Sequence, residues 1–179
     1  MSALLALSRA IDALNTAIGK SARWLILLAV LISAGNAIIR KVFSVSSNSW
    51  LEAQWLLFGM VFMFCTSYTF MKNGHIRIDI VTSRFSKRTR DWIDVFGHLF
   101  FFFPFVILLL IDLVPFVELS WMQNEQSMNA GGLPVWPAKT VILIGFALLG
   151  LQGVSELIKR IAVIQGLIPE PYDAREGSH

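Results

Sequence analysis

The stretch WIDVFGHLFFFFPFVILLLIDLVPFV, from Trp92 to Val117, decides the class of this protein. It contains the run LFFFFPF, Leu99 to Phe105, and Asp112 is a charge near its far end. A hydrocarbon core of about 30 Å is crossed by roughly 20 mostly apolar residues in a helix. The stretch is therefore long and apolar enough to be a transmembrane helix.

Three further stretches around it have the same character. They run from Trp24 to Ile39, from Ala53 to Met71, and from Pro137 onward, the last being apolar from Thr140 to Ser155. None alternates with a period of two, which excludes a transmembrane barrel. The sequence predicts an all-α integral membrane protein with four transmembrane helices.

Composition agrees with a membrane protein and excludes other classes. Of 179 residues, 55% are hydrophobic and 15% are charged, whereas soluble domains have about 25% charged residues. A single cysteine, Cys65, excludes an internal disulfide and a CxxC thiol oxidoreductase. The net charge of +3 comes from residues next to the apolar segments, so it indicates membrane orientation and not binding to nucleic acid.

Lysine and arginine residues predict the orientation. Twelve lie on the side that holds both termini and the connection between the second and third spans, and only Arg40, Lys41 and Lys139 lie on the other side. Since basic loops stay in the cytoplasm, we expect both termini inside. Tryptophans mark the predicted boundaries, with Trp24 and Trp92 at the inner one, and with Trp50, Trp121 and Trp136 at the outer one.

The first twenty residues have their own pattern. Apolar side chains recur at spacings of three and four, and polar ones fall on the opposite side; the apolar set is Leu4, Leu7, Ile11, Leu14 and Ile18, and the polar set is Arg9, Asp12 and Thr16. This predicts an amphipathic interfacial helix that either lies on lipid or braces a partner. We thus expect an interfacial helix over 1–20, a four-helix domain over 21–166 and a cytoplasmic tail over 167–179.

No residue set predicts catalysis, a metal ion or a cofactor. His98 stands alone in its span and is expected to be a hydrogen-bonded interface residue, while His75 lies in a loop and His179 ends the chain, so a haem lacks its two ligands. Near the end of the fourth span, the spacing of Glu156 to Lys159 and Arg160 allows local ion pairs. The protein is expected to be accessory to a chain that carries the transport chemistry, and not an enzyme.

Three segments resemble a known family. They are WLEAQWLLFG at Trp50 to Gly59, GHIRIDIV at Gly74 to Val81, and NAGGLPVWPAKTVILIGFALLGLQGVSELIKRIA at Asn129 to Ala162. In this order they resemble the small membrane (Q, DctQ-type) subunit of tripartite ATP-independent periplasmic (TRAP) transporters. The resemblance covers most of residues 20–166, and its NAGGL…WP variant looks most like a branch that includes 2-oxo-acid systems.

That resemblance implies a place in a bacterial inner membrane and two protein partners. A large M subunit holds the substrate and sodium sites and moves like an elevator, and a periplasmic binding protein delivers an organic anion. The small subunit scaffolds the large one and helps to dock the binding protein.

On this interpretation the outer loop is the candidate docking interface. The residues expected to contribute are Glu118, Gln123, Asn124 and Glu125, together with Glu52 as a structural or docking contact. A merely solvated loop is the alternative. The competing function is a stand-alone homo-oligomeric transporter or channel with four helices, for which Asn36, Gln54, Ser67, His98 and Asp112 supply few polar groups.

Overall fold

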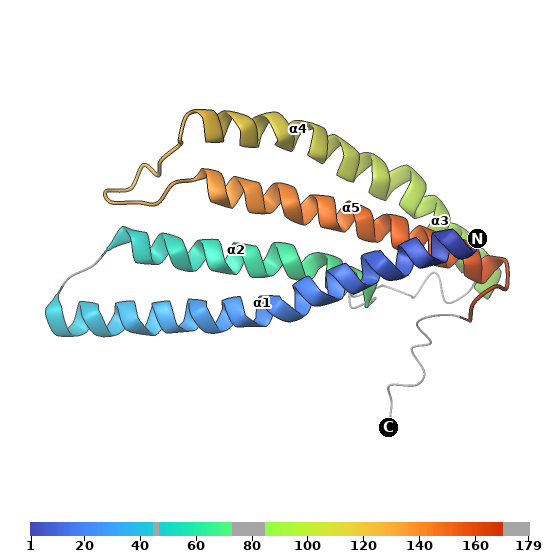
Figure 1. Cartoon of the computed structure of the whole chain (residues 1–179), viewed down its shortest axis with the longest axis horizontal. Coiled ribbons are helices and arrows are strands. Elements are labelled where there is room, and N and C mark those ends of the chain that lie inside the picture. The colour runs from blue at the N-terminus through green and yellow to red at the C-terminus, as the bar shows by residue number, and fades with distance from the viewer. Residues whose placement is uncertain (45–46, 73–84, 170–179) are drawn as a thin grey trace, which may run out of the picture.

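The computed structural model describes residues 1–44, 47–72 and 85–169. Within these ranges the chain forms helices and one isolated β-bridge between Gln126 and Pro134. The helical elements are α1 (Ser2–Phe43), α2 (Asn48–Met71), α3 (Lys87–Gly97), the π-helical turn η2 (His98–Phe102), α4 (Phe103–Met122) and α5 (Trp136–Ile164). They lie side by side in one elongated bundle (Figure 1).

Four helices in the described part of the chain are long and apolar enough to cross a membrane, which confirms the predicted number of spans. Three of them are α1, α2 and α5, and the fourth is the rod formed by α3, η2 and α4. The rod contains Pro104, which has no N–H to donate and whose ring crowds the preceding helical turn. The π-helical turn just before this proline accommodates it without ending the helix.

The bundle has two ends that differ in character. The loop end contains the start of α2, the end of α4, the start of α5 and the 123–135 loop, and the basic end contains the N-terminus, α3 and the end of α5 (Figure 1). The three predicted outer tryptophans, Trp50, Trp121 and Trp136, all lie at the loop end. The structure therefore groups them as an interfacial belt requires.

Helix α1 is one continuous helix, so residues 1–20 are not separated from the first span. Its 42 residues extend for about 63 Å, about twice the thickness of a hydrocarbon core. The N-terminal half crosses obliquely over the end of α5 (Figure 1). The crossing with α2 requires Gly19, because a Cβ atom there would lie 2.6 Å from Tyr68 Cβ.

The packed side of the N-terminal half of α1 is mostly polar. Ser8 and Asn15 are 2% and 1% exposed, whereas Leu7 and Leu14 are 49% and 45% exposed. The predicted apolar face is therefore turned mainly outward, although Ile11 is buried. Whether that face lies on lipid or against a partner stays a prediction.

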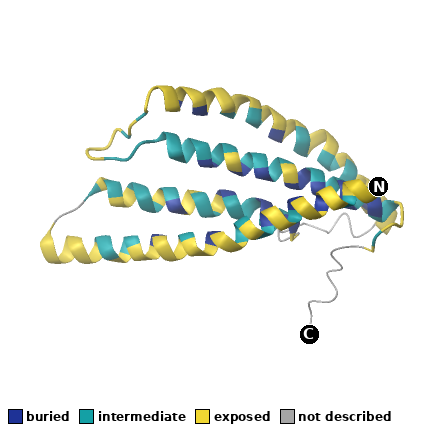
Figure 2. Ribbon diagram, in the orientation of Figure 1, coloured by how far each residue is buried: buried dark blue, intermediate teal, exposed yellow. Residues whose placement is uncertain are grey.

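Helix α5 lies at the centre of the bundle and has the longest set of buried residues (Figure 2). Glycines let its neighbours approach closely, as is common where membrane helices pack. A Cβ atom at Gly145 would lie 2.6 Å from Met63 Cε, and one at Gly153 would collide with the ring of Phe102. The predicted start of this span at Pro137 is confirmed within one residue, because α5 begins at Trp136. The helix ends at Ile164, and Gly166 follows it with a φ of 69°.

Candidate functional site at the two ends of the bundle

Glu52 fastens the 123–135 loop onto the start of α2. Its Oε1 atom accepts hydrogen bonds from Ser127 Oγ at 2.5 Å and from Asn129 Nδ2 at 2.7 Å. Its Oε2 atom accepts one from the backbone N–H of Leu133 at 2.6 Å. Hydrogen bonds to a carboxylate are short and about twice as strong as neutral ones. Glu52 therefore acts as a clasp that holds the loop.

Other residues extend this clasp. Asn48 Nδ2 donates to the carbonyl of Ala130 at 3.0 Å, and Ser49 Oγ donates to the carbonyl of Gly131. A Cβ atom at Gly132 would lie 2.6 Å from Ser127 Cβ and 2.9 Å from Glu52 Oε1. Only glycine therefore fits where the loop passes over the carboxylate.

The other side of the loop begins with a Schellman motif at the end of α4. The N–H of Asn124 donates to the carbonyl of Trp121 at 3.1 Å, and that of Glu125 to the carbonyl of Ser120 at 3.0 Å. This arrangement requires a left-handed residue at Asn124, whose φ is 44°. Asparagine tolerates this conformation better than most residues, so Asn124 has a structural role in the turn.

Glu125 connects the loop to α5. Its Oε2 atom accepts from Lys139 Nζ at 2.5 Å and from Ser120 Oγ at 2.6 Å. The hydrogen bond from Lys139, followed by that from Ser120, lowers the pKa of the Glu125 carboxyl below its usual value. Lys139 also lies 3.9 Å above the ring of Phe116, which adds a cation–π contact. The negative charge of Glu125 is therefore compensated by the ammonium group of Lys139 within the same chain.

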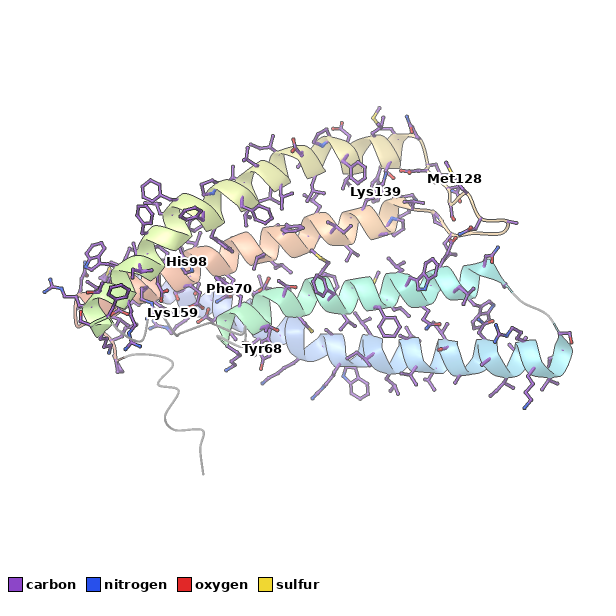
Figure 3. All side chains as sticks on the ribbon, turned by 180° about the vertical axis from the view of Figure 1, so that it is seen from behind. Tyr68, Phe70, His98, Met128, Lys139 and Lys159 are labelled. Carbon is purple, nitrogen blue, oxygen red and sulfur yellow. The ribbon has the colours of Figure 1, made fainter. Side chains whose placement is uncertain are left out.

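The structure thus divides the predicted site residues into two groups. Glu118, Gln123 and Asn124 have exposed side chains, and Glu118 makes no ion pair with any residue that the structure describes. Glu52 and Glu125 are half-buried and engaged on either side of the 123–135 loop. Figure 3 shows Lys139 at this end, beside the loop that carries Met128.

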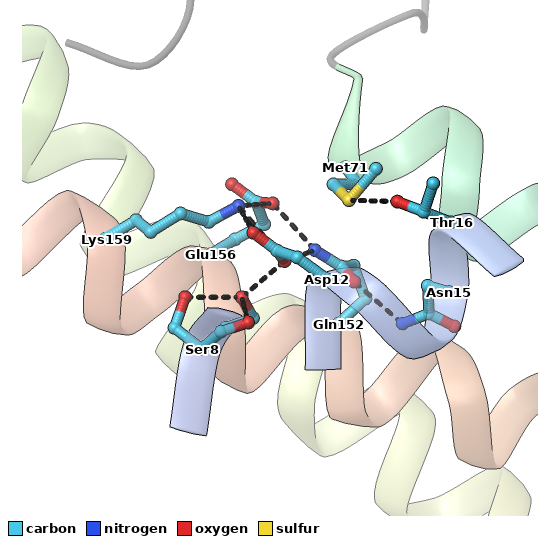
Figure 4. Close-up of polar contacts among 9 residues, drawn as sticks. Ser8, Asp12, Asn15, Thr16, Met71, Gln152, Glu156 and Lys159 are labelled. Atoms are coloured by element: carbon cyan, nitrogen blue, oxygen red, sulfur yellow. Dashed lines mark hydrogen bonds and ion pairs between the residues drawn. The ribbon is translucent and has the colours of Figure 1, made fainter. Parts of the chain in front are cut away.

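A polar network at the basic end joins α1 to α5, and the sequence analysis missed it (Figure 4). Gln152 is at its centre: its Nε2 atom donates to Asp12 at 2.8 Å and to Glu156 at 2.9 Å, and its Oε1 atom accepts from Asn15 at 2.7 Å. Lys159 Nζ lies 3.1 Å from Asp12 and 2.6 Å from Glu156. Two carboxylates thus share one ammonium group between the helices.

The next residue of α5 joins a different helix. Arg160 pairs with Asp91 at 2.9 Å and with Asp94 at 2.9 Å, both in α3. The predicted local pair of Glu156 with Lys159 is confirmed, while Arg160 extends across to α3. Two consecutive cations therefore fix both the N-terminal half of α1 and the start of the third span.

His98 is the hydrogen-bonded interface residue that the sequence predicts. Its Nδ1–H donates to the carbonyl of Asp94 at 2.7 Å, and its ring centroid lies 5.7 Å from those of Phe70 and Phe102. Figure 3 shows His98 on the rod, near Phe70 at the end of α2. This packing is that of a structural histidine.

Comparison with known proteins gives one match. A family model described as "Tripartite ATP-independent periplasmic transporters, DctQ component" matches residues 28–163. No curated protein and no solved structure matches the chain. The match begins within the first span and covers the other three spans and the clasp. It leaves out the N-terminal half of α1 and with it Ser8, Asp12 and Asn15 of the polar network.

Proposed function

Because the chain belongs to the DctQ family, the small permease component of TRAP transporters, we propose that it scaffolds a large membrane subunit and helps to dock a periplasmic binding protein. The family is a transporter component and not an enzyme family. The transport in question is sodium-coupled uptake of an organic anion, a carboxylate such as a 2-oxo acid. Substrate and sodium are bound by the large subunit on this proposal.

The use of the buried polar groups supports a scaffold. Within the described ranges, most buried polar side chains form hydrogen bonds or ion pairs from one helix to another; examples are Ser8, Gln152, Ser155 and Lys159. A transport pathway needs polar groups that face a path for the substrate. Polar groups that are hydrogen-bonded to one another hold the helices in fixed positions. A bundle of this kind is suited to be the rigid support of a partner that moves. This favours the scaffold over a stand-alone channel.

The distribution of charge supports the orientation. The basic end carries the lysines and arginines of the N-terminal half of α1, of α3 and of the end of α5, so the positive-inside rule places it in the cytoplasm. The 123–135 loop then faces the periplasm of a bacterial inner membrane. That is the compartment in which a binding protein would approach.

We attribute docking of the binding protein to the residues that are exposed at the loop end of the bundle. Glu118 is exposed and has no ion pair among the described residues, and Gln123 and Asn124 are exposed beside it. A free carboxylate there can steer a basic patch of the binding protein. Glu52 and Glu125 contribute indirectly, since they hold the loop in one shape.

Charge reversal at Glu118 tests the docking proposal. Glu118→Lys should slow association of the binding protein several-fold at low salt, and the difference should fade as salt screens the charges. Association is measured by surface plasmon resonance on the complete transporter, with Glu118→Gln as an intermediate variant. Glu125→Lys is unsuitable, because it would also break the pair with Lys139. Unchanged association with intact assembly would remove the docking claim and leave the scaffold untouched.

A further inference from the structure

We propose that a groove between the loop-end halves of α2 and α5 binds one phospholipid with an amine headgroup. The cavity has a volume of about 530 Å³. It is a ligand site that neither membership of the family nor the proposed scaffold role requires. We call it the α2–α5 groove.

One face of each helix lines the groove. The residues from α2 repeat at intervals of three and four, which places them on a single face; they are Glu52, Trp55, Leu56, Gly59, Met60, Phe62 and Met63. From α5 come Ala138, Val141 and Ile142. The charged and amide or hydroxyl side chains of the lining are those of Glu52 and of two loop residues, Ser127 and Asn129, and the residues of α2 and α5 farther from the loop are apolar.

The two helices diverge from a tight contact. Met63 lies against Gly145, where a Cβ atom would be only 2.6 Å from its Cε atom, and this contact closes the inner end of the groove. Toward the loop the helices leave space, and Gly59 has no heavy atom within 4 Å of an added Cβ. Trp55 and Phe62 are 66% and 71% exposed, so the groove opens sideways to the surrounding bilayer.

The length of the groove matches one leaflet. Glu52 and Met63 are eleven residues apart on one helix, a rise of about 16 Å. Half of a hydrocarbon core of about 30 Å is about 15 Å. A chain that enters beside Glu52 would therefore end near the middle of the bilayer, as an acyl chain of the outer leaflet does.

The width of the groove suits one hydrocarbon chain. A volume of about 530 Å³ spread over roughly 16 Å gives a cross-section of roughly 33 Å². A helix with side chains is about 10–12 Å across, which corresponds to a cross-section of roughly 80–110 Å². One hydrocarbon chain therefore fits within the groove, whereas a whole transmembrane helix could only lie across its opening.

The charge at the mouth selects the headgroup. Glu52 accepts three hydrogen bonds, all from neutral donors, and pairs with no cation among the residues that the structure describes. A carboxylate at the edge of an apolar groove is stabilised by a nearby positive charge. The ammonium group of phosphatidylethanolamine supplies that charge at headgroup level, whereas phosphatidylglycerol adds only a negative one.

A variant that fills the groove tests the site. Gly59→Leu places a side chain into the open space of the groove, and Gly35→Leu is its matched control, since Gly35 in α1 also has open space but does not line the groove. Both purified chains and the wild type are partly delipidated in detergent, supplied with phosphatidylethanolamine or phosphatidylglycerol of the same acyl chains, and analysed by native mass spectrometry.

We expect one phosphatidylethanolamine per wild-type chain, retained at least fivefold over phosphatidylglycerol, kept in Gly35→Leu and lost in Gly59→Leu. Glu52→Gln should lower the ratio of retained phosphatidylethanolamine to retained phosphatidylglycerol until it is close to one. Equal retention of phosphatidylglycerol, or unchanged retention in Gly59→Leu, would overturn the proposal. Absence of bound lipid from the wild-type chain would also overturn it.

Discussion

Replacing Gln152 by leucine should destabilise the junction between α1 and α5. The side chain is fully buried, with 0% exposure. Leucine is of similar size, so packing is largely kept while three hydrogen bonds are lost, two of which cross to α1. The effect therefore reports on the polar network itself.

The size of the effect follows from those contacts. Hydrogen bonds between membrane helices average about 0.6 kcal/mol each, so the two that cross to α1 contribute about 1 kcal/mol. Leaving the buried Asn15 amide without its acceptor adds about 1–3 kcal/mol. We expect Gln152→Leu to lower the free energy of unfolding by about 2–4 kcal/mol. Adding Asn15→Leu should recover part of this loss, because the unsatisfied amide is then removed.

The assay is unfolding in mixed micelles by titration with sodium dodecyl sulfate, followed by far-ultraviolet circular dichroism. Gln165→Leu is the matched control, since Gln165 lies at the end of the same helix and is exposed. A stabilising role for the polar network is refuted if Gln152→Leu is as stable as this control. It is also refuted if the effects of Asn15→Leu and Gln152→Leu simply add, because coupled residues should not behave independently.

Three further results are expected. Gly145→Ala should lower the free energy of unfolding by about 1–3 kcal/mol in the same titration, since the added methyl would push Met63 and α2 away; wild-type stability would exclude the tight contact. Arg160→Gln leaves Asp91 buried without its charge partner and should cost about 3 kcal/mol, seen as a lower melting temperature; an unchanged melting temperature would contradict this. The lowered pKa of Glu125 means that its ion pair contributes fully above about pH 4.5 and is lost as the pH falls through the lowered value. In the wild type, a spin label at residue 126 should then become more mobile in acid. In Glu125→Gln, the same label should be mobile at every pH, so acid should not change its mobility.

The number and limits of the spans could be predicted from the sequence because they depend on local properties. Apolar length fixes a span, and Pro137 and Gly166 mark where the last helix begins and ends. The predicted span from Ala53 to Met71 coincides with most of α2, whose additional first turn carries Glu52. These features require no knowledge of other parts of the chain.

The contacts that join helices could not be predicted, because they connect distant residues. Asp12 and Lys159 are 147 residues apart, and Glu52 and Leu133 are 81 apart. Helical periodicity shows that Asp12 lies opposite the leucines, but it does not show which face packs against protein. Beside a membrane the inward face can be the polar one, since lipid accepts the leucines and the polar groups find partners within the protein.

A pull-down tests whether this chain supports a larger transport subunit. The C-terminally tagged chain is expressed with its natural neighbouring proteins, extracted in mild detergent and analysed by quantitative mass spectrometry. We expect one large multispan subunit for each copy of this chain. Recovery of the chain as a pure homo-oligomer would rule out the scaffold role and favour the stand-alone channel.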